Sequence, residues 1–130
     1  MSNYRQEIES IKKETKPEYF KAEIGKIIPR LAKEIIKEKL KGKTYDLLRT
    51  TAMTTDITET AFLFYEGDKD LYDYLCNFIA SAALFLTENK DVYHPWDYFR
   101  AISKNPDKYK DMFKDEYYLK QISKINEELS

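Results

Sequence analysis

The sequence contains few of the residues that build strands, tight turns and metal sites. Among 130 residues there are three Gly, four Pro, one Cys, one His and a single Val. One cysteine excludes an intramolecular disulfide, and together with one histidine it leaves no ligand set for a structural zinc ion. The glycines stand too far apart for a phosphate-binding loop. We therefore predict no catalytic residue, no metal and no cofactor, and expect a protein that is not an enzyme.

The abundant residues are Lys, Glu, Leu, Ile, Tyr and Ala, which favour helices over strands. Hydrophobic residues make up 42% of the chain and charged residues 35%, a balance typical of globular proteins. The length is sufficient for one domain with a real core. We predict an all-α fold, a single compact helical bundle of roughly five to seven helices, with residues 1–130 as one helical domain.

Caps and prolines divide the first part of the chain. Ser2 or Asn3 can cap a helix that ends near Thr15, and Pro17 fits the first position of the next helix. Pro29 then either kinks that helix or restarts it.

Residues 50–60 are unusually rich in threonine, which is a modest helix former. Their hydroxyls either bond to nearby backbone in a loop or line a contact surface. Asp56 and Glu59 have the spacing of a capping box. A helix is therefore expected to start at Asp56 and to run to Gly67.

The most apolar helix is expected from Leu71 to Asn89, with Asp68 or Asp70 as its cap. Apolar residues cover most of its circumference, so it should be the most buried element. Cys76 lies in this run, so its thiol should be shielded from solvent and packed among apolar side chains. The uncharged stretch, residues 74–87, is shorter than the roughly 20 residues that cross a bilayer.

The C-terminal part should begin with a helix at Pro95, after His94 in a capping position, and this helix should end before Pro106. The remaining residues predict one or two helices. Their apolar seam consists of Tyr118, Ile122, Ile125 and Leu129.

The polar amino terminus has no signal-peptide features, so we expect a soluble, cytoplasmic protein without membrane contact. The chain has 18 Lys and 13 Glu but only 5 Asn and 2 Gln, a balance typical of thermophilic proteins. A thermophile, or a virus of one, is one possible source.

Charge is unevenly distributed along the chain. Residues 1–50 have 13 Lys and Arg against 8 Asp and Glu, a net charge of +5, whereas residues 51–130 have 9 against 15, a net charge of −6. Such halves could neutralise each other within one fold or in head-to-tail assembly.

The basic half contains a ridge of cations at helical spacing, on a helix expected to continue to Gly42. At about 100° per residue the ridge occupies one face, opposite the apolar residues. It could bind a nucleic-acid backbone, a protein partner or only water. We call these five cations the basic ridge: Lys26, Arg30, Lys33, Lys37 and Lys41.

Aromatic residues form 15% of the chain and are frequent in its last third. If these aromatic side chains are exposed, they would anchor an interface or stack on nucleic-acid bases. If they are buried, they would belong to the hydrophobic core. The predicted interface aromatics are Tyr93, Trp96, Tyr98 and Tyr117.

One arrangement of carboxylates could bind magnesium. Glu34 and Glu38 on one helix would face Asp70 and Asp73 on another, as in helical nucleotide pyrophosphatases. The chain lacks the denser acidic pattern of those enzymes, and a capping role explains Asp70.

Two short segments carry a resemblance: Leu47-Leu48-Arg49-Thr50-Thr51, and Thr60-Ala61-Phe62-Leu63 ahead of the Tyr- and Leu-rich helix from Leu71 to Phe78. They resemble the small helical subunits of type III CRISPR effector complexes. The resemblance implies an all-helical subunit of a ribonucleoprotein complex with a basic face toward RNA or DNA.

The residues themselves favour a non-catalytic helical interaction or assembly protein, acting through the basic ridge and the aromatic C-terminal region. Its partner would be another protein or a second copy of the chain. The alternative is a nucleic-acid-binding small helical subunit.

Overall fold

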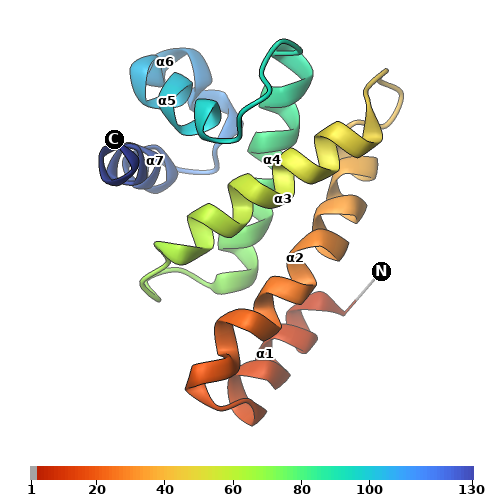
Figure 1. The fold of residues 1–130 in the computed structure, drawn as a ribbon, viewed down its shortest axis with the longest axis vertical. Coiled ribbons are helices and arrows are strands. Elements are labelled where there is room, and N and C mark those ends of the chain that lie inside the picture. The colour runs from red at the N-terminus through yellow and green to blue at the C-terminus, as the bar shows by residue number, and fades with distance from the viewer. Residues whose placement is uncertain (1–2) are drawn as a thin grey trace.

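The computed structural model describes residues 3–130, and over these residues the chain folds into an all-α bundle. This part contains seven α-helices, one short 3-10 helix and no strand. In chain order the elements are α1 (Tyr4–Glu14), α2 (Pro17–Lys39), α3 (Leu47–Leu63), α4 (Leu71–Glu88), α5 (Trp96–Lys104), α6 (Pro106–Tyr109), η1 (Lys110–Met112) and α7 (Glu116–Leu129). In Figure 1, α1 and α2 lie on one side, the C-terminal helices lie on the other, and α3 and α4 lie between them. The predicted fold class is confirmed.

The boundaries of α1 and α2 follow their local signals. Thr15 ends α1, and Pro17 occupies the first turn of α2. Asn3 is the N-cap residue of α1 but makes no side-chain capping bond, and Ser2 lies outside the described residues. Pro29 is exposed and lies inside an uninterrupted helix, so the prediction of a restart there is wrong.

The helix α3 begins nine residues before the predicted Asp56 start, at Leu47. The cap is Asp46, whose carboxylate accepts a hydrogen bond from the Arg49 amide at 3.1 Å. Asp56 lies in the helix interior, so the capping-box prediction is wrong. The spacing alone cannot distinguish a cap from two acidic residues on an exposed helix face.

The threonine-rich stretch is therefore helical and largely buried. Thr50, Thr54 and Thr58 face the core and are at most 1% exposed. The Thr58 hydroxyl donates to the Thr54 carbonyl at 2.8 Å, a bond that satisfies the hydroxyl within the helix. Both sequence interpretations, a loop and an exposed contact surface, are wrong at these three positions.

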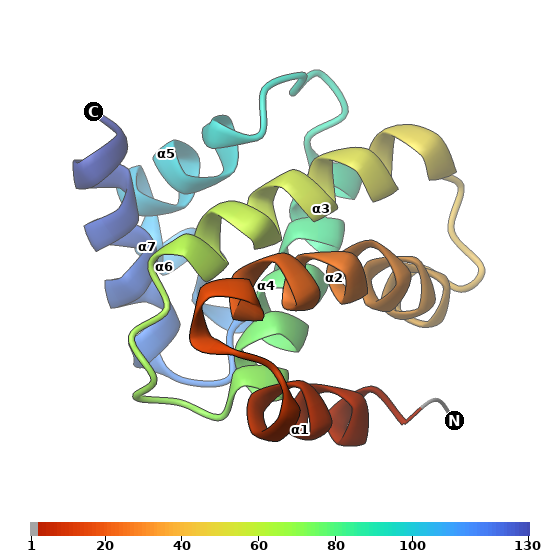
Figure 2. The same ribbon diagram turned by 60° about the horizontal axis from the view of Figure 1, so that its bottom comes forward.

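The helix α4 is the most buried element, as predicted. Asp70 caps it by accepting a hydrogen bond from the Asp73 amide at 3.0 Å. One row of its side chains, including Phe78 and Phe85, packs in a cluster with α3, α5, α6 and α7. Another row, including Leu75 and Ile79, packs in a second cluster with α1 and α2. Figure 2 shows α4 behind α3, between these two groups of helices.

The C-terminal third contains α5, α6, η1 and α7. The helix α5 ends before Asn105 and Pro106, as predicted. In the predicted seam of α7, Tyr118, Ile122 and Ile125 are buried, which confirms three of its four positions.

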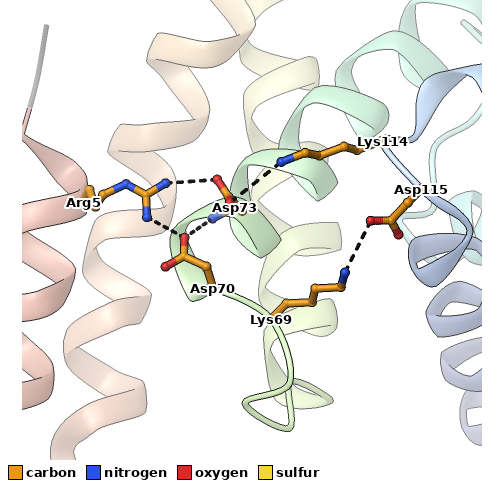
Figure 3. Close-up of polar contacts among 6 residues, drawn as sticks. All are labelled: Arg5, Lys69, Asp70, Asp73, Lys114 and Asp115. Carbon is orange, nitrogen blue, oxygen red and sulfur yellow. Dashed lines mark hydrogen bonds and ion pairs between the residues drawn. The ribbon is translucent and has the colours of Figure 1, made fainter.

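Ion pairs join α1, the start of α4 and the segment before α7 (Figure 3). The Arg5 guanidinium contacts Asp70 at 2.7 Å and Asp73 at 3.1 Å. Burial opposes ionisation of Asp70, but the Asp73 amide and Arg5 outweigh it and lower the pKa of the Asp70 carboxyl. Two further pairs complete the network: Lys114 with Asp73 at 3.9 Å, and Lys69 with Asp115 at 3.4 Å. These carboxylates are therefore committed to cations and caps. Among residues 3–130 no three His, Cys, Asp or Glu side chains form a group that could hold a metal ion.

Candidate functional site

The basic ridge lies on the exposed face of α2, but it is less uniform than the sequence predicts. Lys26 pairs with Glu23 at 3.0 Å, and Arg30 pairs with Glu7 of α1 at 2.6 Å. Lys41 lies beyond the end of the helix, which stops at Lys39.

Lys33 and Lys37 remain as the cations of the helical ridge without a neutralising partner. Both are exposed, and neither forms an ion pair with any residue in the range 3–130. The positive charge available to a partner is therefore concentrated in the second half of α2.

The predicted interface aromatics separate into exposed and packed residues. Tyr93 and Trp96 are 78% and 43% exposed. Tyr98 is fully buried, and its hydroxyl lies 2.6 Å from the Ser81 hydroxyl, so its prediction as an interface residue is wrong. Sequence could not distinguish these cases, because Trp96 and Tyr98 share one short helix and only tertiary packing decides which ring is covered.

Tyr117 is half-buried rather than free. Its hydroxyl donates to the Asp68 carboxylate at 2.7 Å, and the Lys69 ammonium lies 4.9 Å from its ring centre. Burial is the largest cause of a raised pKa for this phenol, and the hydrogen bond with Asp68 adds to it. Tyr117 therefore fastens the α3–α4 connection to α7.

Trp96 borders a groove between α2, α3 and the start of α5. The groove has a volume of about 380 Å³. Its apolar lining includes Ile28, which is buried, and Leu63, which is 63% exposed. We call this site the α2–α3 groove; it is lined by Lys21, Gly25, Ile28, Asp56, Glu59, Thr60, Phe62, Leu63, Pro95 and Trp96.

Hydrogen bonds between side chains and backbone groups hold Trp96 at the edge of the groove. The Arg49 guanidinium donates to the carbonyls of Asn89 and Val92, which holds the segment leading into α5. The His94 ring then accepts a hydrogen bond from the Trp96 amide at 3.2 Å, and the two rings meet edge to face at 5.3 Å. The helix α5 thus begins at Trp96, one residue later than predicted, with Pro95 as its N-cap residue, and His94 bonds to the first helical amide from the position before the cap.

Two carboxylates of α3 give the groove negative charge. Asp56 and Glu59 form no ion pair within residues 3–130. Burial, and then the neighbouring Asp56 charge, raise the pKa of the Glu59 carboxyl. Lys21 is the one basic side chain of the lining, so the ionised groove has a net negative charge.

Gly25 opens the groove in the middle of α2. Its backbone does not need glycine, because among residues 3–130 positive φ angles occur only at Gly42 and Gly67. A β-carbon built at Gly25 would meet nothing within 4 Å. Internal packing therefore gives no reason for glycine there, and the open space faces outward.

Sequence reasoning missed this groove because it assigned Asp56 and Glu59 to a capping box and could not bring α2, α3 and the start of α5 together. Once residues 47–63 form one helix, Leu48, Asp56, Glu59 and Leu63 share its outer side. The sequence signal for this surface was the position of Leu48 and Leu63, which do not lie on the same side of the helix as the buried threonines.

A second hollow, of about 430 Å³, lies beside Cys76 and extends to Lys39, Asp111 and Phe113. Burial raises the pKa of the Cys76 thiol to about 11, so the nucleophilic thiolate is scarce at neutral pH. This setting suits a packing thiol rather than a catalytic one.

The fold and the groove define a helical bundle with an acidic and apolar surface groove. The chain matches no known protein family model, and searches of curated proteins and of solved structures give no match. In the part of the chain that the structure describes, none of the helices has both the length and the apolar character needed to cross a bilayer.

Proposed function

We propose that the protein is a non-catalytic protein-interaction module and that the α2–α3 groove is its docking site. The observation that supports the proposal is the combination of exposed apolar side chains with carboxylates that have no partner. A helix carrying an apolar side chain beside a Lys or Arg has the matching chemistry.

Exposed apolar groups supply the favourable term for docking. Leu63 and Trp96 present apolar surface on two sides of one depression. Covering Leu63 would contribute about 1–2 kcal/mol, and tryptophan is a residue type often found at the energetic centre of interfaces. Gly25 lets the backbone of a partner approach α2 closely.

The carboxylates supply specificity. Asp56 and Glu59 would repel a phosphate backbone and attract a basic side chain. Burial and then repulsion by Asp56 raise the pKa of Glu59, and a cation placed between the two carboxylates would offset that repulsion. These charges favour a protein partner over nucleic acid at this site.

Affinity purification of the tagged protein from the cells that encode it tests the proposal. Leu63→Asp introduces a charge into the groove, and Leu48→Asp is the matched control. Leu48 is 84% exposed on the same helix and lies outside the lining. We expect partners recovered with the wild type and with Leu48→Asp to be lost with Leu63→Asp. Equal recovery with all three proteins would refute the groove as a docking site.

The basic ridge allows a separate test of the alternative, a nucleic-acid-binding subunit of a ribonucleoprotein complex. Lys33 and Lys37 are the free cations such a contact would use. A titration with single-stranded RNA should then give affinity that falls steeply with salt and that is abolished by Lys33→Glu with Lys37→Glu. That result would favour the alternative. Undetectable RNA binding at low salt would instead favour a protein as the partner of the basic ridge.

A further inference from the structure

We propose that the occupant of the α2–α3 groove is the basic ridge of a second copy of this chain, so that copies join head to tail. The inference rests on the proposed docking function of the groove and names its partner. Two features of residues 3–130 support it: complementary charge and the directions of the two surfaces.

The two surfaces have opposite charges, and charged groups of both form no ion pair within residues 3–130 of a single copy. Asp56 and Glu59 in the groove make no ion pair, and neither do Lys33 and Lys37 on the ridge. Joining two copies would bring these groups together and neutralise both. The net charges of the chain, +5 over residues 1–50 and −6 over residues 51–130, follow the same division.

The ridge face also carries an exposed aromatic residue near the start of α2. Tyr19 is 58% exposed in the first turn of α2. Counted at about 100° per residue, Tyr19 lies on the same side of α2 as Lys26, Lys33 and Lys37. At a rise of 1.5 Å per residue, Tyr19 lies about 21 Å from Lys33 along α2, so it would contact a neighbouring copy beyond the groove rather than fill it.

The two surfaces face different directions, which determines the kind of assembly. Lys21, Gly25 and Ile28 line the groove, and their directions on the helical wheel lie about 140° from the centre of the ridge. A copy that places its ridge in a neighbour's groove therefore keeps its own groove free. Such contacts are heterologous, and they build a ring or a filament rather than a closed two-fold dimer.

Charge-reversal variants of the two surfaces test this inference by sedimentation velocity. The ridge variant is Lys33→Glu with Lys37→Glu, and the groove variant is Asp56→Lys with Glu59→Lys. The wild type should form species larger than a dimer as concentration rises, and salt should weaken them. Each variant alone should associate at least about tenfold more weakly, because like charges then face each other.

A one-to-one mixture of the two variants is the decisive sample. In the mixture the native ridge meets the native groove and the reversed ridge meets the reversed groove, so opposite charges face each other at both contacts and assemblies larger than a dimer should return. Lys104→Glu with Lys120→Glu is the matched control, since it makes the same charge change at two exposed lysines outside both surfaces. The control should assemble as the wild type does, and circular dichroism should show the same helicity for all variants.

The results also separate this inference from the proposed function. A wild type that stays monomeric at every concentration and salt would overturn self-assembly, even if Leu63→Asp still abolishes capture of another protein. Assembly that both reversals leave unchanged would show that copies meet through other surfaces. Absence of both self-assembly and Leu63-dependent capture would overturn the docking function itself.

Discussion

Replacement of Gly25 by alanine should make the folded protein more stable. Glycine in a helix interior costs about 0.5–1 kcal/mol relative to alanine, because the unfolded glycine chain has more conformational freedom to lose. The penalty is usually repaid by a backbone angle or a close contact that only glycine allows. Gly25 has neither, since its φ is not positive and an added β-carbon meets nothing within 4 Å. We therefore expect Gly25→Ala to stabilise by about 0.5–1 kcal/mol, a rise of about 2–5 °C in Tm for a chain of this size.

Urea unfolding followed by circular dichroism would measure this gain, at a concentration where the protein is monomeric. Gly42→Ala is the internal control of opposite sign. Gly42 has a φ of +82°, a left-handed conformation that costs an alanine about 1–2 kcal/mol. The two substitutions add the same methyl group. If their changes in the free energy of unfolding have opposite signs, the difference comes from the backbone conformation and the free space at each position.

Gly25 lines the α2–α3 groove, so the same methyl group would enter the groove, and Gly25→Ala should weaken assembly while it stabilises the fold. A variant that is less stable than the wild type would refute the reasoning, because the β-carbon would then have to clash. A variant that is more stable and assembles as well as the wild type would leave Gly25 without a role in the groove.

Two further predictions concern the core. Phe78→Ala should destabilise the protein by about 3–5 kcal/mol in urea unfolding, because the ring is fully buried between α4 and α7 and its removal leaves a cavity; a loss below about 1 kcal/mol would contradict the packing described. Cys76 should react with a thiol reagent at pH 8 roughly a hundredfold more slowly in the folded protein than in denaturant, since burial raises its pKa from 9.0 to about 11. Because the folded state disfavours the thiolate, the contribution of Cys76 to stability is fully present below pH 9.0 and is lost as the pH rises to about 11; equal labelling rates in the folded and unfolded protein would show that α4 is exposed.

The features predicted correctly from sequence are those that neighbouring residues determine. Pro17 begins α2, Asp70 caps α4 and Pro106 follows the end of α5, each through contacts within a few residues. The central position of α4 also followed from sequence, because apolar residues on nearly all sides of a helix require neighbours on all sides.

The groove could not be predicted in the same way. Thr50, Thr54 and Thr58 look like a solvated face, and only packing against other helices places them in the core. The capping role predicted for Asp56 and Glu59 concealed their position on the outer side of α3, which they share with Leu63. The ridge was found from its spacing, but the neutralisation of Arg30 depends on Glu7, a residue 23 positions away that α1 brings to it.

The position of α4 between two clusters has a consequence for how the molecule unfolds. Its opposite rows of side chains belong to two separate hydrophobic clusters, one with α1 and α2 and one with α5, α6 and α7. Loosening either group of helices removes one wall of α4, and apolar surface of the other cluster then becomes accessible to water. The two sides therefore lack independent thermodynamic stability, and the backbone amides of α4 should exchange with solvent only when the whole bundle opens.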